Sequence, residues 1–335
     1  MVNVIKTIIP ALALLLPAWN IHASNCPEQL SGVLHKNNLQ SLQDNIWRLQ
    51  HSGDHELAAR RAELLARALG EGAPVNGRTV KIREASTEVY KIDLDNGLSG
   101  VFKPDMPDNP ISFYKHEVAA WIVDGLTGTG IVPVTVARKM IINGTERTGS
   151  FQLFVKNDGT AAELIAGART NSETLVKQIE NSAQYKNMRF LDWLISNRDR
   201  QGRNILARTD PDTGITQLAA AIDHSLSFGT SGAWRPFFIM PDPPVMLRLG
   251  AIGDAEIFRR LSPWLEPQKI QDLIKRKNWF LANFKKSPDG KSLAPIDDAA
   301  AGRARLDKEA AQLISPDYHK NRLKEYMQRM GVFRW

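Results

Sequence analysis

The hydrophobic pattern of the chain changes from helical to strand-like near residue 76. Between residues 36 and 70, apolar residues recur at spacings of three and four, and a polar HSGD segment interrupts the run. This spacing predicts two amphipathic helices joined by a turn. Apolar and polar residues then alternate from residue 78 to 103, with the tight-turn signal DNG at residues 95–97. We therefore expect three strands in this stretch, the last of them ending on Lys103.

A helix and two more strands should follow. The pattern predicts a helix that begins near Pro110 and ends near Gly125 or Gly128. Two strand-like runs then continue to Val155 around the turn sequence NGTE. This part of the chain is therefore expected to be a small β-rich lobe with one helix.

Beyond Val155 the chain turns mostly helical. Helical spacing covers residues 172–197 and dominates from about residue 253, and a short β pair is expected within residues 203–223. Residues 233–250 are aromatic and rich in proline, which predicts a loop that either shapes an acceptor pocket or packs on the surface. The element order favours an α+β fold with a larger, mostly α second lobe.

These patterns predict the following division of the chain. Residues 1–23 form a signal peptide, and residues 24–76 form a helical N-terminal extension. Residues 77–335 form the main domain, with an N-lobe over about 77–156 and a C-lobe over about 157–335.

The first residues are typical of an export signal. Lys6 precedes an apolar segment from about Ile8 to Trp19, and small residues follow around Ala23. The segment is shorter than the ~20 apolar residues that span a bilayer, so a cleaved signal is favoured over a membrane anchor. We expect an exported protein, periplasmic or secreted, with no transmembrane segment in the mature chain. Its single cysteine, Cys26, excludes an intramolecular disulfide.

The formal net charge of +7 suits an anionic ligand, an acidic partner or a membrane surface. Lys and Arg are spread along the chain with acids between them, and no aromatic-basic stacking motif is present. The sequence therefore predicts no nucleic-acid partner.

One ordered set of polar residues matches the needs of phosphoryl transfer from ATP. That reaction needs a cation for the phosphates, an acid that orients the cation, oxygen ligands for a divalent metal and a carboxylate near the attacking hydroxyl. Lys103 ends an expected strand, and Glu117 lies on the helix that follows. Asp199 and Asn204 share one loop, and Asp223 ends the expected β pair. Each residue alone is weak evidence, but the ordered set favours an ATP-dependent enzyme.

The strings SNRDRQGRNIL and AIDHSLSFG resemble the catalytic loop and metal-binding segment of an atypical kinase-like superfamily. This superfamily holds the phosphatidylinositol 3- and 4-kinases, the HipA toxins and the Golgi casein kinase-like secretory kinases. Upstream, VYKIDLDNGLSGVFKP and HEVAAWIVDGLTGTGIVPVT are similar to its nucleotide-lysine strand and its Glu-bearing helix. The resemblance covers about residues 78–230 and implies a two-lobed protein-kinase-like fold. The residues that match the loop and metal segment are Asn197, Asp199, Arg200, Asn204 and Asp223.

The resemblance also implies roles for the matching residues. Lys103 would contact the α- and β-phosphates of ATP, and Glu117 would position it. Asp199 would act as base or orienter for the acceptor hydroxyl. Asn204 and Asp223 would hold Mg²⁺ or Mn²⁺.

The nucleotide site needs two further elements. The segment EASTEVY would cover the phosphates with Ser86, Thr87 and backbone N–H groups, because the chain has no Gly-rich fingerprint of the ordinary protein-kinase type. The stretch from Phe151 to Val155, which includes Phe154, would line the adenine site at the expected junction of the lobes. Gln201 stands where the family often has His.

The function that this set favours is an exported ATP-dependent kinase. Its acceptor would be a protein Ser or Thr, or another hydroxyl on a lipid or small molecule. Two alternatives remain open: the same fold performing adenylyl transfer or another ATP-driven modification, and a catalytically inactive exported binding or scaffold protein.

Overall fold

The computed structural model describes Leu49 and residues 55–82, 87–106, 113–168, 172–229 and 240–283. The expected signal peptide, most of the first expected helix and the chain from residue 284 onward lie outside these residues. The described chain consists of helices and two antiparallel sheets, which confirms the expected α+β class. None of its helices has the length and apolar character needed to cross a membrane.

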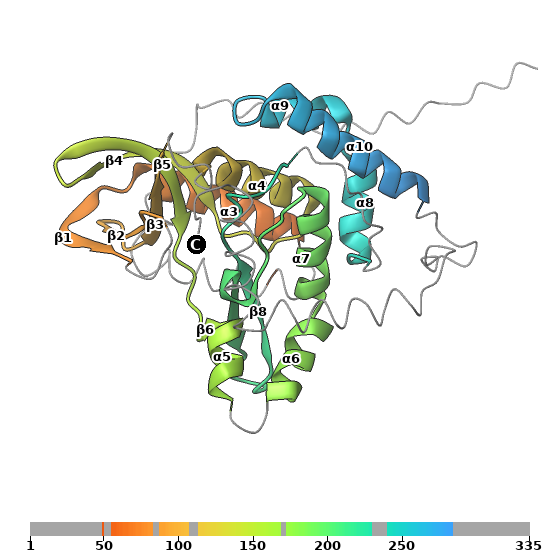
Figure 1. Cartoon of the computed structure of the whole chain (residues 1–335), viewed down its shortest axis with the longest axis horizontal. Coiled ribbons are helices and arrows are strands. Elements are labelled where there is room, and N and C mark those ends of the chain that lie inside the picture. Colours follow the sequence, from red (N-terminus) through yellow and green to blue (C-terminus); the bar gives the residue numbers. More distant parts are fainter. Residues whose placement is uncertain are drawn as a thin grey trace, which may run out of the picture.

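The larger sheet has five antiparallel strands in the order β1-β2-β3-β5-β4 (Figure 1). These strands are β1 (Pro74–Lys81), β2 (Tyr90–Leu94), β3 (Ser99–Pro104), β4 (Thr135–Ile142) and β5 (Thr145–Leu153). The DNG sequence forms the β2–β3 turn, where the Gly97 N–H donates to the Leu94 carbonyl at 3.1 Å. Asn143 and Gly144 have φ values of 51° and 77°, as a tight two-residue hairpin requires. The expected strands are confirmed, and the third continues one residue past Lys103.

Helix α3 (His55–Glu71) packs against this sheet. Leu65 and Leu69 of the helix share a hydrophobic cluster with the buried Phe102 of β3. Arg138 of β4 donates a hydrogen bond of 2.7 Å to the Leu69 carbonyl, one of the groups that the last turn of a helix leaves without an intrahelical partner. Helix α3 lies where the sequence places the second of two N-terminal helices, and it contributes to the core of the larger sheet.

Helix α4 (Tyr114–Thr127) lies between the larger sheet and the helical part of the molecule. It contacts β4 and β5 on one side and α8 and α9 on the other (Figure 1). Its C-terminus is capped by Gly128, whose φ of 72° is the left-handed conformation expected of a capping glycine. The predicted start near Pro110 lies outside the described residues, and the predicted end at Gly128 is confirmed.

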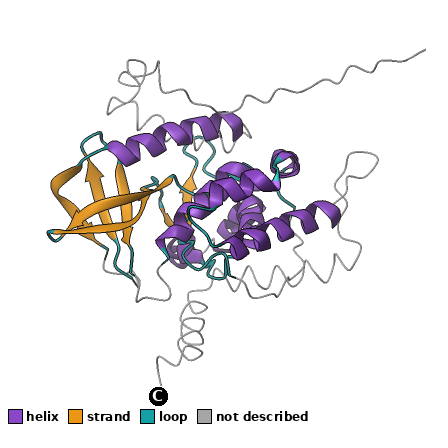
Figure 2. Cartoon of the chain, turned by 90° about the horizontal axis from the view of Figure 1, so that it is seen from above, coloured by secondary structure: helices purple, strands orange, loops and turns teal. Residues whose placement is uncertain are grey.

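The rest of the described chain surrounds a second hydrophobic cluster to which α4, α7 and α10 all contribute. Figure 2 shows the larger sheet at one end of the molecule and most of the helices at the other. The helices are α5 (Ala161–Gly167), α6 (Ser172–Asn181), α7 (Ala183–Leu194), α8 (Pro243–Ala251), α9 (Asp254–Leu261) and α10 (Pro267–Asn283), with a 3₁₀ turn at Gly202–Asn204. The smaller sheet contains β6 (Gly159–Thr160), β7 (Ile205–Thr209) and β8 (Thr216–Ala221).

The helical spacing of residues 172–197 is confirmed as two helices, because Ser182 caps a new one, its hydroxyl accepting the Tyr185 N–H at 3.2 Å. One expectation for this part of the chain was wrong. The segment 233–250 is not a loop throughout, because α8 begins at Pro243. Proline is well tolerated in the first turn of a helix, where no intrahelical N–H donor is required. The expected β pair is confirmed as β7 and β8, and β6 is an addition that the sequence pattern did not predict.

Candidate active site

Lys103 bridges two carboxylates that come from separate elements. Its Nζ lies 2.6 Å from Glu117 Oε1 on α4 and 2.9 Å from Asp223 Oδ1, two residues after β8. The Lys103 and Glu117 side chains are 19% and 2% exposed, whereas that of Asp223 is 35% exposed. Glu117 follows Lys103 by 14 positions and Asp223 follows it by 120, so the three side chains meet only in the folded chain.

The charges of this cluster stabilise one another. Burial would lower the pKa of Lys103, but the carboxylates of Asp223 and Glu117 outweigh burial and raise it well above its usual value. Burial likewise opposes the charged form of Glu117, but Lys103 and a hydrogen bond from His224 lower the pKa of that carboxyl. Lysine cation and glutamate anion are therefore both present at neutral pH.

Asp223 has an unusual backbone conformation. Its φ is 60°, in the left-handed region that non-glycine residues seldom occupy, although aspartate tolerates it better than most. The Ser225 hydroxyl donates to Asp223 Oδ1 at 3.0 Å and, together with Lys103, fixes the carboxylate. Phe228, five residues further on, also has a left-handed φ, of 59°. Such conformations occur at sites where the surrounding contacts overdetermine the backbone.

The loop after α7 carries Asp199 and Asn204. The Asp199 N–H donates to Asn197 Oδ1 at 3.0 Å, and the Asp199 carbonyl accepts the Asn204 side-chain amide at 2.9 Å. The Asn197 side-chain amide donates in turn to Asp192 Oδ1 at 2.8 Å. Asp199 is half-buried and Asn204 is 6% exposed, so the loop has a defined shape before any ligand binds.

Arg200 joins this loop to the Asp223 segment. Its guanidinium forms a two-bond ion pair with Asp192, and it also donates to the carbonyls of Asn204 and Ile222 at 2.7 and 2.6 Å. Asn204 is itself an expected metal ligand, and Ile222 directly precedes the other one, Asp223. Because guanidinium donors have a fixed planar geometry, Arg200 sets the distance between the two segments.

His224 completes a path of contacts from Arg200 to Glu117. Arg200 Nη2 lies 2.8 Å from His224 Nε2, and because arginine can only donate, Nε2 accepts and the proton sits on Nδ1. Nδ1 faces Glu117 Oε2 at 3.7 Å, and the same oxygen accepts the His224 backbone N–H at 3.0 Å. Burial, first of all, and Arg200 lower the pKa of His224, so the ring is neutral.

The other residues expected to contact the nucleotide are Ser86, Thr87, Phe154 and Val155. The Phe154 N–H donates to the Ser99 carbonyl at 2.8 Å, and its ring lies 4.1 Å from Lys91 Nζ. Phe154 is 38% exposed and Val155 is half-buried, so both are accessible to a ligand. Thr87 is half-buried, and Ser86 lies outside the described residues.

The donor atoms at Asn204 and Asp223 suit a hard divalent cation. Asn204 uses its side-chain nitrogen to bond the Asp199 carbonyl, so its oxygen is the atom suited to a metal, and Asp223 supplies a partly exposed carboxylate. Carboxylate and amide oxygens are the ligands that Mg²⁺ prefers, often with water and substrate phosphates completing the shell. Within the described residues, no group of three or more His, Cys, Asp and Glu side chains is placed to hold a metal. The pair therefore fits a cation that is bound together with a phosphate ligand.

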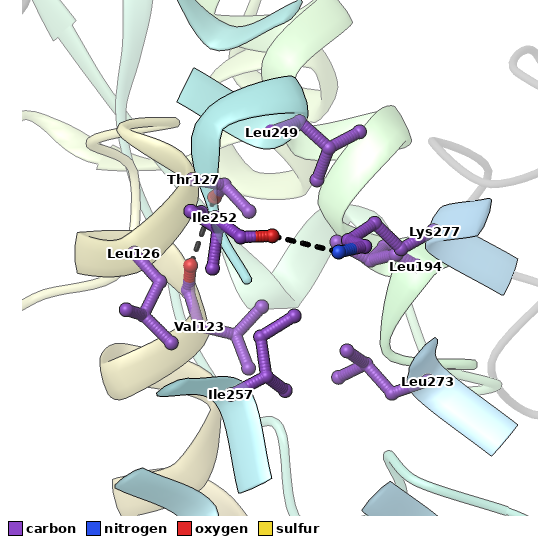
Figure 3. Close-up of a pocket in the computed structure, with 9 residues that line it drawn as sticks. All are labelled: Val123, Leu126, Thr127, Leu194, Leu249, Ile252, Ile257, Leu273 and Lys277. Carbon is purple, nitrogen blue, oxygen red and sulfur yellow. Dashed lines mark hydrogen bonds between the residues drawn. The ribbon is translucent and has the colours of Figure 1, made fainter. Parts of the chain in front are cut away.

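A small apolar cavity lies away from this cluster. Its volume is about 10 Å³, and Figure 3 shows it between residues of α4, α7, α8, α9 and α10, with Lys277 at one side. The Lys277 ammonium is already bonded, to the Ile252 carbonyl at 2.7 Å and to Asp254 at 2.6 Å. The cavity is a packing defect between helices and shares no residue with the candidate active site.

Sequence reasoning missed three residues of the site. Asp192 is an isolated acid within the apolar run RFLDWLIS, a pattern that signals a buried carboxylate in need of a partner. Arg200 matches a motif of the catalytic loop, but the motif gives it no expected role. His224 lies beside Asp223 as a possible metal ligand, but no metal-pair spacing of His supports that role. The Asp192 signal was readable in the sequence, but its pairing with Arg200 depends on how the loop folds.

The comparisons with known proteins found distant structural neighbours. No family model matches the chain, and neither does any curated protein. A crystal structure of the Golgi casein kinase with Mn/ADP bound is 13% identical in sequence and has a TM-score of 0.46. The match covers 67% of this chain and 75% of the kinase chain. Another crystal structure of the Golgi casein kinase is 13% identical, covers 67% and 74%, and has a TM-score of 0.43. The structure of hydra Fam20 with sugar is 12% identical, covers 66% and 87%, and has a TM-score of 0.42. These values define neither an activity nor a substrate of this chain.

Proposed function

We propose that the protein is an exported ATP-dependent phosphotransferase with a two-lobed, atypical kinase-like fold. The observation that carries the proposal is Lys103, which is held between Glu117 on α4 and Asp223 after β8. A lysine that is oriented by a helix glutamate and lies beside a metal-binding aspartate is the arrangement that phosphoryl transfer requires.

Each residue then has a role in the transfer. Lys103 binds the α- and β-phosphates, and Glu117 keeps its ammonium in place. Asp199 accepts the proton of the acceptor hydroxyl as that oxygen attacks the γ-phosphorus. The bond from the γ-phosphorus to the β–γ bridging oxygen breaks, and ADP leaves.

Asn204 and Asp223 are the proposed ligands of Mg²⁺ or Mn²⁺. When bound, the cation supplies positive charge that neutralises the phosphates. Lys103 contacts Asp223 directly at 2.9 Å, so the side chains that would meet phosphate and metal are adjacent. Phe154, Val155, Ser86 and Thr87 are proposed to contact the rest of the nucleotide.

The acceptor is proposed to be a protein Ser or Thr hydroxyl, with a lipid or small-molecule hydroxyl as the other outcome of the test. Export is proposed from the N-terminal sequence pattern, and fractionation of cells that produce the full chain tests it. Recovery of the protein only from the cytoplasm, with its N-terminus intact, would contradict export.

The experiment that tests the activity uses ATP labelled at either the γ- or the α-phosphate. Purified protein is incubated with each, with Mg²⁺ or Mn²⁺ and a general protein acceptor mixture, beside Asp223→Ala and a matched control, Asp212→Ala. Asp212 lies in an exposed turn. Transfer of γ-label that is lost only in Asp223→Ala supports a kinase. Transfer of α-label indicates adenylyl transfer, and absence of both transfer and ATP binding indicates a non-catalytic protein.

A further inference from the structure

His116 contacts two elements that are far apart in the sequence. It precedes Glu117 on α4 and is 6% exposed. Its Nδ1 lies 2.8 Å from the Ser225 carbonyl oxygen, and its Nε2 lies 3.3 Å from Lys269 Nζ in the first turn of α10. The ring therefore stands between the start of α10 and the segment that follows Asp223.

Only one protonation state satisfies both contacts of His116. A carbonyl oxygen can only accept, so Nδ1 must carry a proton, and an ammonium can only donate, so Nε2 must be bare. Burial, first of all, and the neighbouring Lys269 lower the pKa of His116 to about 4. The imidazole is therefore neutral at physiological pH, and its charge does not change near that pH.

Aromatic rings enclose His116. Its centroid lies 4.9 Å from that of Phe113 and 5.5 Å, edge-on, from that of Phe228. Lys269 Nζ also lies 6.0 Å from the Phe113 ring centroid, within cation–π range. These contacts leave the imidazole little freedom to turn away from the Ser225 carbonyl.

His116 and Glu117 hold neighbouring backbone groups. Glu117 Oε2 accepts the N–H of His224 at 3.0 Å, and His116 Nδ1 donates to the carbonyl of Ser225 at 2.8 Å. The first turn of α4 thus binds the segment directly after Asp223 at two points. The left-handed conformation of Asp223 needs such external support, because it is intrinsically unfavourable.

We infer that His116 and Lys269 are positioning residues that tether the segment 223–229 to α10. The inference rests on the proposed function in one respect: the tether would keep Asp223 where a metal-bound phosphate needs it. It assigns α10 a role in the active site, although its Lys269 is not expected to contact substrate. The tether itself is a property of the folded chain and can be measured without any activity.

The test measures amide hydrogen exchange of the segment 223–229 in the whole protein. His116→Phe keeps a ring but removes both polar contacts, and Lys269→Met removes the ammonium and keeps most of the stem. We expect roughly three- to tenfold faster exchange in both variants, the effect of losing about one net hydrogen bond. Lys275→Met is the matched control, because Lys275 lies on the same helix with 60% of its side chain exposed. In Lys275→Met, the amides of the segment 223–229 should exchange at the wild-type rate.

A conservative variant separates positioning from simple packing. The side-chain amide of Asn can donate in place of Nδ1, so His116→Asn should recover much of the protection that His116→Phe loses. Unchanged exchange in Lys269→Met overturns the tether, even if His116→Phe fails to fold. Equal loss of protection in the Asn and Phe variants also overturns it, because the donor would then have no specific effect.

A second readout separates the tether from the proposed function. If both hold, Lys269→Met raises the Mn²⁺ concentration needed for half-maximal transfer about threefold or more and leaves the γ-phosphate as the transferred group. Faster exchange without any transfer by the wild type supports the tether and refutes the kinase. Faster exchange with unchanged Mn²⁺ dependence overturns the link between the tether and Asp223.

Discussion

Arg200 and Asp192 form a buried ion pair through two bonds, from Nε to Oδ2 at 2.9 Å and from Nη2 to Oδ1 at 3.0 Å. Their side chains are 3% and 7% exposed. The Arg200 guanidinium also donates hydrogen bonds to the carbonyls of Asn204 and Ile222. The two segments that carry the expected metal ligands thus share one organising residue.

Replacement of Arg200 should destabilise the fold. Arg200→Met leaves the Asp192 charge buried without its cation, which costs about 3–5 kcal/mol of unfolding free energy. Urea unfolding followed by tryptophan fluorescence measures the change. Arg259→Met is the control, because Arg259 makes a comparable pair with Glu256 but is 67% exposed. It should change stability little, and equal losses in both variants would show that burial of the Arg200 pair has no special weight.

The Lys103–Glu117 pair should show strong energetic coupling. Lys103→Met leaves Glu117 buried and unbalanced, at a cost of about 3–5 kcal/mol, whereas Lys103→Met with Glu117→Gln removes both charges and should recover a large part of that loss. A double-mutant cycle of unfolding free energies gives the coupling. The same cycle on the exposed pair Lys139–Glu146, 2.8 Å apart, is the control. If the losses of unfolding free energy in Lys103→Met and Glu117→Gln simply add in the double variant, the bridged geometry is contradicted.

Asp124 should make stability depend on pH between about 4 and 7. Burial, opposed by hydrogen bonds from the Ile131 and Val132 N–H groups and the Thr129 hydroxyl, raises the pKa of Asp124 to about 6 from 3.8. Between these values the folded state binds more protons than the unfolded state, so stability from this group is present at low pH and is lost as pH rises through 6.

Asp124→Asn isolates this effect. All three donors bond Oδ1, which asparagine retains, so the variant should fold. The difference in unfolding free energy between wild type and variant should shift by about 2 kcal/mol in favour of the wild type from pH 7 to pH 4.5. A difference that stays constant with pH would mean that Asp124 titrates normally.

Gly149 should be required for the position of Lys103. A Cβ at Gly149 on β5 would overlap the Lys103 carbonyl oxygen and lie 2.8 Å from Pro104 Cα on the paired strand. Gly149→Ala should therefore cost about 1–3 kcal/mol and weaken nucleotide binding. Gly250→Ala, in α8 with open space around it, should instead gain about 0.5–1 kcal/mol. Normal stability and binding in Gly149→Ala would show that β3 tolerates displacement.

Local signals accounted for most of the strands and for the chain positions of the site. The DNG and NGTE turns, the alternation before Lys103 and the helix that carries Glu117 all follow from short-range chemistry. The prolines of residues 233–250 predict a loop, but proline is equally suited to a first helical turn, and α8 begins at Pro243.

The long-range contacts could not be derived in this way. Lys103 and Asp223 are 120 residues apart, and His116 and Lys269 are 153 apart. Nothing in the local sequence of either partner specifies the other, because such pairs depend on how α4 packs between the larger sheet and the helical part. The left-handed φ of Asp223 also has no local signal in the sequence, because glycine is the residue that usually takes this conformation.

If Lys103, Glu117 and Asp223 form a metal-dependent nucleotide site, the binding of ATP should depend on Mn²⁺. Calorimetric titration with ATP in the presence and absence of Mn²⁺ measures this for the wild type, Asp223→Asn and the exposed control Asp212→Asn. We expect Mn²⁺-dependent binding in the wild type and the control, and loss of the Mn²⁺-dependent part in Asp223→Asn. Failure of the wild type to bind ATP, or equal Mn²⁺-dependent binding by all three proteins, would contradict such a site.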